Sequence, residues 1–312
     1  MPDLLLKMDS PPSDPYFNTH YHADFIELNA LINNDLGVDL NDFASIYESE
    51  PTDKIQANLK SLSEDCAGVI MYRLSAYGTD SYPFIIENGS KLKLKDLLSD
   101  LHKAYIFLLL CSCSKYLSTE NASIVRRDFE RFSNSMLKRY LRESDTCHIM
   151  GKAGIQEQRY KGHITDKLDL LAKDTKTKTL YEEHYFSEKN SGDGGLDLIA
   201  WSPFLGDDNF KFTPLYIGQC ATGRDWIKKQ DEPAKLARYI DKAGPMTVCL
   251  FIPYDGRNST GTFNHDADIR HPTNIIFDRL RLLLISKDMN FINEIPAFKL
   301  VDDIICFEED LI

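Results

Sequence analysis

The sequence predicts an α/β fold that follows an all-helical N-terminal region. Up to about residue 145, apolar residues recur at helical spacing, most clearly in the segments 94–117 and 123–142. Beyond that point, short apolar segments typical of strands alternate with helical segments, which is the pattern of an α/β sheet. We therefore expect a helical N-terminal domain (residues 1–120) and an α/β domain (residues 121–312).

The first domain is expected to begin with an arm, because residues 1–20 are rich in proline and aspartate. Short helices are expected between residues 26 and 75, and one short strand at 84–86. His20, His22 and Asp24 have the spacing of a metal-binding H-x-H motif followed by an acid. No strand precedes them and they fall in the expected arm, so we expect no metal there.

The second domain is expected to contain a run of alternating elements. In chain order they are a helix (161–174), three strands (179–186, 196–201 and 215–220), a helix (226–242), a central strand (247–253), a helix or strand (275–285) and a late strand (301–307).

Composition excludes several classes of protein. No apolar run approaches the ~18 residues that a membrane span needs. The first residues carry acids and prolines instead of the basic start of a signal peptide, so we expect a cytoplasmic protein with no membrane partner. The seven cysteines form no C-x-x-C pair, so free buried thiols are expected instead of a zinc ribbon or a disulfide framework.

Charge is unevenly distributed along the chain. The net charge is −12, but residues 1–50 carry −9 and residues 251–312 carry −5, whereas the middle, 51–250, carries +2. A phosphate-binding surface is therefore compatible with the middle of the chain, provided that it is local.

The most informative segment is SGDGGLDLIAW (191–201), followed by LYIGQCATG (215–223). A glycine-rich turn ends in Asp197, which opens an apolar strand, and the second strand ends in Gln219. Two adjacent antiparallel strands would place these two side chains together at one edge of the sheet. An acid among apolar neighbours is costly to bury without a role, which favours a functional site over a structural one.

This G-D-G-G-L-D … G-Q-C pattern resembles the Mrr-type restriction endonucleases of the PD-(D/E)XK nuclease superfamily. The resemblance covers residues 125–255 and implies a restriction-endonuclease-like mixed sheet flanked by helices, in the order αβββαβ. It also implies that Asp197 binds a divalent metal and that Gln219 occupies the E/Q position of the (E/Q)-x-K motif. The lysine position of that motif is held by Ala221, which departs from the family.

Other cations are available for the role of the missing lysine. Some members of the superfamily carry their lysine on the following helix, which this chain opens with Lys228 and Lys229. We favour Lys229, with Lys228 and Arg224 as alternatives.

An upstream helix of the family often supplies a glutamate to the metal. Mrr-type domains carry a Phe-Glu pair there, which Phe129-Glu130 matches, so Glu130 is the second expected metal ligand. Glu157 and Asp166 are alternatives. The metal implied by this oxygen-rich set is Mg²⁺ or Mn²⁺.

The resemblance implies a Mg²⁺-dependent DNA endonuclease, the nuclease component of a prokaryotic restriction or anti-phage defence system. A helicase or sensor would be its protein partner. The main alternative is a catalytically inactive nuclease-like scaffold that binds a protein or DNA in a complex. A third reading is a metal-dependent hydrolase of small phosphates. The sequence leaves open the oligomeric state and the choice between DNA and RNA.

Overall fold

The computed structural model of the chain describes most of its residues in ten stretches. These are 19–33, 35–41, 53–151, 158–182, 195–204, 213–241, 244–257, 261–263, 274–287 and 294–306, with residues 8, 12 and 186 and only the backbone of 53–59. The chain forms two compact units, each assembled from separate segments. The first comprises Met1–Arg126, Pro253–Asn264 and Lys287–Ile312, and the second comprises Arg127–Ile252 and His265–Ser286. Two late segments thus belong with the N-terminal residues, whereas the sequence analysis assigned everything after residue 120 to one domain.

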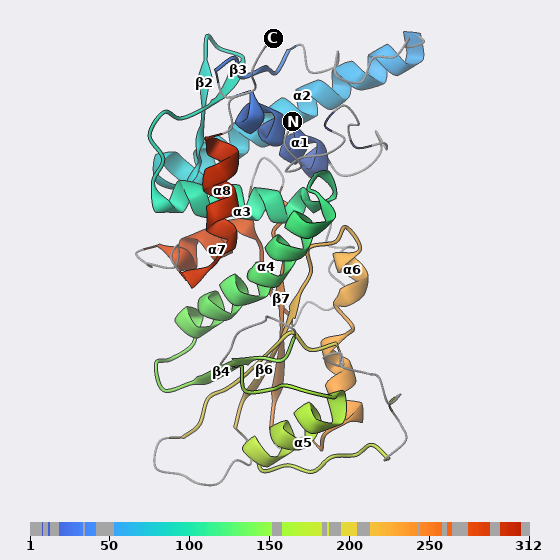
Figure 1. Cartoon of the computed structure of the whole chain (residues 1–312). Helices are drawn as coiled ribbons and strands as arrows, with labels where there is room; N and C mark the ends of the chain where they lie inside the picture. Colours follow the sequence, from blue (N-terminus) through green and yellow to red (C-terminus); the bar gives the residue numbers. More distant parts are fainter. Residues whose placement is uncertain are drawn as a thin grey trace. The chain divides into compact units, whose positions relative to one another are not determined.

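In its described residues, the first unit contains helices packed on one another and a small sheet (Figure 1). Its elements are α1 (Thr19–Ile32), β1 (Val38–Asp39), α2 (Asp53–Ser81), β2 (Phe84–Glu87), β3 (Lys91–Leu94), α3 (Asp100–Ser112), a 3₁₀ turn (Ser114–Tyr116), the start of α4 (Thr119–Tyr140) and α8 (Ala297–Ile305). Helix α1 packs against α2 and α3, and α3 packs against α8.

The small sheet has the strand order β1-β3-β2, and both pairs are antiparallel. Three residues (88–90) connect β2 to β3, and two of them, Asn88 (φ 51°) and Gly89 (φ 85°), have the left-handed backbone that matches the twist of a hairpin. The expectation of an all-helical N-terminal region is therefore wrong. The sequence indicated only one of the three strands, because β1 is two residues long and β3 carries lysines at its alternate positions.

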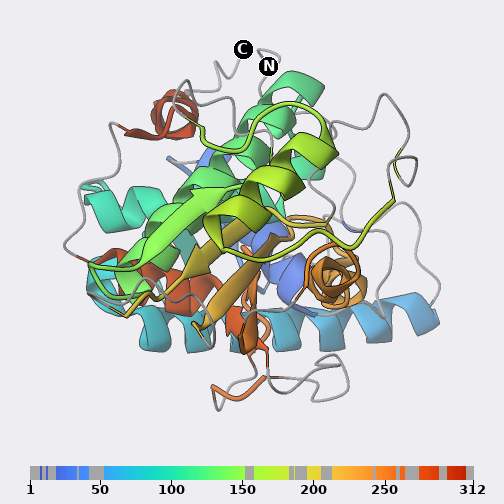
Figure 2. The ribbon, with the colours of Figure 1, turned by 90° about the horizontal axis from the view of Figure 1, so that it is seen from below.

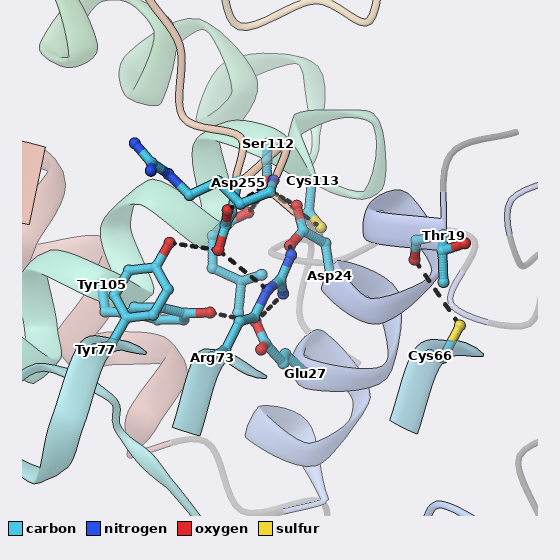
Figure 3. A network of polar contacts seen from close by, with 12 residues as sticks. Thr19, Asp24, Glu27, Cys66, Arg73, Tyr77, Tyr105, Ser112, Cys113 and Asp255 are labelled. Carbon is cyan, nitrogen blue, oxygen red and sulfur yellow. Dashed lines mark hydrogen bonds and ion pairs between the residues drawn. The ribbon is translucent and has the colours of Figure 1, made fainter. Parts of the chain in front are cut away.

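The arginine Arg73 of α2 is fully buried among three carboxylates (Figure 3). Its Nη2 lies 2.8 Å from Asp24 of α1, its Nη1 lies 2.9 Å from Glu27 of α1, and its Nε lies 3.8 Å from Asp255. Burial and the three carboxylates act on its pKa in opposite directions, and the balance holds the guanidinium charged, with its pKa well above the ordinary value.

Hydroxyl groups complete this cluster. Tyr77 donates to Asp255 at 2.8 Å, Tyr105 donates to Glu27 at 2.8 Å, and Ser112 donates to Asp24 at 2.6 Å. A further tyrosine, Tyr82, donates to the other oxygen of Glu27 at 2.7 Å. The cluster thereby ties three helices and the segment after β7 into the first unit. Helix α1 begins at Thr19, and His20, His22 and Asp24 are buried in it. These three residues therefore belong to a packed helix and not to the expected N-terminal arm.

The second unit contains a five-stranded mixed sheet in the order β4-β5-β6-β7-β8. Its elements are the rest of α4, β4 (Thr146–Ile149), α5 (Ile164–Asp174), β5 (Leu198–Trp201), β6 (Leu215–Cys220), α6 (Trp226–Lys229), the 3₁₀ helix Pro233–Arg238, β7 (Met246–Phe251), β8 (Ile275–Phe277) and α7 (Arg279–Ser286). The pairs β4–β5 and β5–β6 are antiparallel, whereas β6–β7 and β7–β8 are parallel. The expected α/β class with a mixed sheet is confirmed at this level.

Helices α4 and α5 contact opposite faces of this sheet. The apolar face of α5 packs on Ile199 and Ile217, and Figure 2 shows α5 lying across the strands. On β4, His148 faces the same side, where its ring meets that of Tyr160. The neighbouring Cys147 points the other way and its thiol donates to Asn134 of α4 at 3.0 Å.

Three expected elements of the α/β domain differ in the structure. The helix expected over 226–242 is split into α6 and a 3₁₀ helix, because Pro233 cannot donate a backbone hydrogen bond and starts a new segment. The strand expected over 301–307 is wrong: α8 ends at Ile305, and its buried residues recur at spacings of three and four. Among the described residues of 179–186 there is no strand, only a bridge between Thr179 and Ile240.

All seven cysteines are free thiols, as expected, and only Cys306 is exposed. Among the described residues, no helix combines the length and the apolar character that a membrane crossing requires.

We predict that Arg73→Met destabilises the first unit by about 3–5 kcal/mol, because it leaves three buried carboxylates without their cation. Lys103→Met is the control in the same unit, since Lys103 pairs with Asp302 at 2.7 Å and the two side chains are 27% and 47% exposed; it should cost less than about 1 kcal/mol. Denaturant unfolding measures both variants. Equal losses would show that the buried cluster is not held by Arg73.

Candidate functional site

The site predicted from the sequence lies where β6 ends and β5 begins. Gly195, with φ 86°, makes the turn that leads into β5, and Leu198 pairs with Gly218 across the two strands. A Cβ at Gly218 would lie 2.8 Å from that of Leu198, so only glycine permits this approach of the strands. The register therefore sets Asp197 opposite Gln219, as the sequence analysis expected of two antiparallel strands.

The carboxylate of Asp197 is buried and accepts two hydrogen bonds at one oxygen. Oδ2 accepts from Gln219 Nε2 and from the backbone N–H of Cys220, each at 2.6 Å. Asp197 and Gln219 are both 6% exposed. Two donors from the neighbouring strand therefore compensate for part of the desolvation of the charge.

The amide of Gln219 is fixed in one orientation by this contact. Its nitrogen must face Asp197, since its oxygen there would repel the carboxylate. Its Oε1 then points away, is buried, and has no hydrogen-bond partner among the described residues. A buried acceptor left without a partner is costly, so this oxygen is a candidate for binding a ligand that the chain itself does not supply.

Glu130 of α4 lies close to the same edge of the sheet, next to the residues that follow β4. Its carboxylate lies against Gly151, where a Cβ would be 3.0 Å from Cδ of Glu130. Gly151 and Met150 follow β4, and their N–H groups donate to the backbone oxygen of Asp197 at 3.3 and 2.7 Å. Glu130 is therefore separated from the Asp197 backbone by a single glycine.

Electrostatics at Cys220 involve three of the predicted residues. Burial is the main cause that raises the pKa of this thiol well above its ordinary value, and the charges of Asp197 and Glu130 raise it further. The charge of Lys229 acts in the opposite direction and lowers this pKa. Asp197 and Gln219 therefore lie at the end of β6, where the charges of Glu130 and Lys229 also act on the pKa of the Cys220 thiol.

The two lysines of α6 differ in exposure. Lys228 is exposed, whereas Lys229 is half-buried, and the charge of Lys229 lowers the pKa of the Cys220 thiol. Arg224 is also exposed. Ala221, at the position of the family lysine, is fully buried and its N–H donates to Phe251 at 2.9 Å.

The structure describes one of the two alternatives to Glu130 as second metal ligand, Asp166, and not the other, Glu157. Asp166 is exposed and accepts from the N–H of His163 at 3.2 Å, as part of the capping box of α5. Glu157 lies outside the described residues, as does Asp193 of the glycine-rich turn.

The sequence analysis missed Lys167 of α5. It is 2% exposed, and its Nζ donates to the backbone oxygen of Met150 at 2.9 Å, next to the Asp197 contact. A signal was present, since Lys167 lies three residues after Ile164 and four before Leu171, on the apolar face of the helix.

The oxygen donors at this edge fit a hard cation. Mg²⁺ and Mn²⁺ prefer carboxylate and amide oxygens, which Asp197, Glu130 and Gln219 Oε1 supply. Within the described parts of the chain, no group of three or more histidines, cysteines, aspartates and glutamates is arranged to hold a metal. A cation here would therefore need the amide oxygen, phosphate oxygens of a substrate or water in addition to the carboxylates.

Comparison of the chain with protein-family models, with curated proteins and with solved structures gives no match.

We predict that Gly151→Ala weakens Mn²⁺ binding about tenfold with little loss of stability. The new methyl group displaces the carboxylate of Glu130, which is the end of a flexible side chain, and disturbed support of a metal ligand typically costs 10–100-fold in affinity. Calorimetric titration with Mn²⁺ and thermal unfolding measure the two effects.

The matched control is Gly68→Ala, because a Cβ at Gly68 meets nothing within 4 Å. It should leave Mn²⁺ affinity unchanged. Asp197→Asn, which removes one ligand charge at constant volume, should weaken Mn²⁺ binding at least as much as Gly151→Ala. Unchanged affinity in both site variants would place the metal elsewhere or nowhere.

Proposed function

We propose that the protein is a metal-dependent endonuclease that hydrolyses phosphodiester bonds of DNA, with its site at Asp197 and Gln219. The observation that carries the proposal is the buried Asp197–Gln219 pair with its unpartnered amide oxygen. Neither feature contributes to a closed hydrophobic core, and both suit a site that is completed by a cation and a phosphate.

The order of elements around the pair supports the proposal. Helix α4 is followed by β4, β5, β6, the short helices between Trp226 and Arg238, and β7. This is the αβββαβ order that the resemblance implies, with α5 inserted after β4. The first three strands are antiparallel and the last is parallel to β6.

Each residue has a proposed role. Asp197 and Glu130 would hold the cation, and Gln219 would add its amide oxygen. When bound, Mg²⁺ or Mn²⁺ would lower the pKa of an attacking water and neutralise charge that develops on the phosphate. Lys229 would stabilise the negative charge of the transition state from α6, in place of a lysine at Ala221.

The wider setting is proposed from the resemblance alone. The protein would act in the cytoplasm as the nuclease component of a prokaryotic restriction or anti-phage defence system, beside a helicase or sensor partner.

The second candidate is a catalytically inactive nuclease-like scaffold, which binds a protein or DNA. Full burial of Ala221 favours it, since a lysine in that place would be desolvated and the family motif is not reproduced. A small-phosphate hydrolase is a third candidate and differs from the first in its substrate.

Plasmid cleavage tests the first candidate. The purified protein should convert supercoiled DNA to nicked or linear forms with Mg²⁺ or Mn²⁺, and the Asp197→Ala variant should not. Cleavage that survives in Asp197→Ala would refute the site, and hydrolysis of nucleotides without cleavage of plasmid would favour the third candidate.

The two lysines of α6 separate an enzyme from a scaffold. Lys229→Ala should lower the cleavage rate at least a hundredfold with little change in melting temperature, because it removes charge stabilisation of the transition state. Lys228→Ala is the matched control, since it removes the same charge from an exposed neighbour, about 100° away around the helix. Wild-type rates in both variants would rule out Lys229 and make Arg224 the next residue to test.

A further inference from the structure

One turn of α4, RDFER (127–131), carries two arginines beside the candidate site. Asp128 and Phe129 are fully buried, whereas the side chain of Arg127 is 39% exposed and that of Arg131 is 15% exposed. Residues three and four apart are neighbours on a helix surface, so Arg127 lies beside both Glu130 and Arg131.

Asp128 holds both guanidinium groups. Its Oδ1 accepts from Arg131 Nη1 at 2.9 Å and from Arg127 Nε at 3.5 Å. A fully buried carboxylate must be paired, which explains why the two arginines converge on it. This shared carboxylate holds the two guanidinium groups in place on one turn of the helix.

This arginine pair is close to the candidate site. Glu130 lies between the two arginines in sequence, and its carboxylate is against Gly151 and acts on Cys220 at the end of β6. Within the described part of the chain, the contact of Arg127 with Asp128 uses Nε, which leaves its two terminal nitrogens available to a ligand.

We propose that Arg127 and Arg131 bind a phosphate of the nucleic-acid backbone next to the bond that is cut. The inference rests on the proposed function and extends it to the substrate. A planar guanidinium presents paired N–H donors that match phosphate geometry, and an anchored guanidinium loses less conformational freedom on binding. A phosphate site limited to two guanidinium groups also suits a chain of net charge −12, whose residues 51–250 carry only +2.

Duplex binding tests the inference separately from cleavage. Fluorescence anisotropy of a labelled DNA duplex is measured with Ca²⁺ in place of Mg²⁺, for the wild type and for the double variant Arg127→Gln/Arg131→Gln. The dissociation constant should rise about tenfold or more, and the slope of log K against log salt should fall by about 1–2, since one or two phosphate contacts are lost.

The matched control is Lys138→Gln/Arg139→Gln. Both residues are exposed and lie on the same helix, two turns further along, and the variant loses the same charge. It should change the dissociation constant less than threefold. Thermal unfolding checks that both variants fold. Because the double variant removes both arginines from the buried Asp128, Arg127→Gln alone, which keeps Arg131 on Asp128, is measured beside Lys138→Gln and should raise the dissociation constant more than that control. Inorganic phosphate serves as a competitor that reports binding of a small phosphate.

The possible outcomes separate the phosphate site from the endonuclease activity. Duplex affinity that depends on Arg127 and Arg131, in a protein that never cleaves, supports the phosphate site and refutes the endonuclease. Cleavage by a protein whose duplex affinity is the same with and without these arginines overturns the inference and leaves the endonuclease standing. Equal losses in the variant and its control, absence of duplex binding in the wild type, or binding of inorganic phosphate alone also overturn it.

Discussion

The buried carboxylate of Asp197 constrains the second unit more than any other charge at the sheet edge. Its Oδ2 accepts from Gln219 and from the backbone of Cys220, and its own backbone oxygen accepts from Met150 and Gly151. One residue therefore joins β4, β5 and β6 at their common edge. Since a desolvated carboxylate is tolerated only with donors in place, this requirement and the glycine at Gly218 together fix the register on which the site depends.

The first unit meets the same physical problem with a different solution. Arg73 brings one cation to three buried carboxylates, and tyrosine and serine hydroxyls supply the remaining donors (Figure 3). One of the carboxylates, Asp255, lies four residues after the end of β7 at Phe251. The chain passes from the second unit to the first in this stretch, so the ion cluster of the first unit fixes a segment that continues directly from a strand of the second.

Helix α4 links the packing of the second unit to its proposed chemistry. Phe129 and Asp128 are buried, the first by hydrophobic contact and the second through its ion pairs, and this burial determines where Glu130 and the two arginines of the same turn are held. Residues that stabilise the helix therefore also orient the groups that would meet a cation and a phosphate. The same geometry suits a binding scaffold as well as an enzyme. The two functions are therefore distinguished by whether cleavage depends on the charge of Lys229.

The sequence by itself determined the α/β class, the strands that hold Asp197 and Gln219, and their meeting at one edge, because alternation, turn glycines and an acid among apolar residues are local signals. It failed where distant contacts decide: β1 is two residues long, and α8 has an apolar run that fits either a strand or a helix. Only the tertiary structure decided that Lys167 is buried beside Met150 and that late segments join the first unit. Long-range packing and ion pairing select among local conformations of similar free energy, and no short stretch of sequence contains those partners.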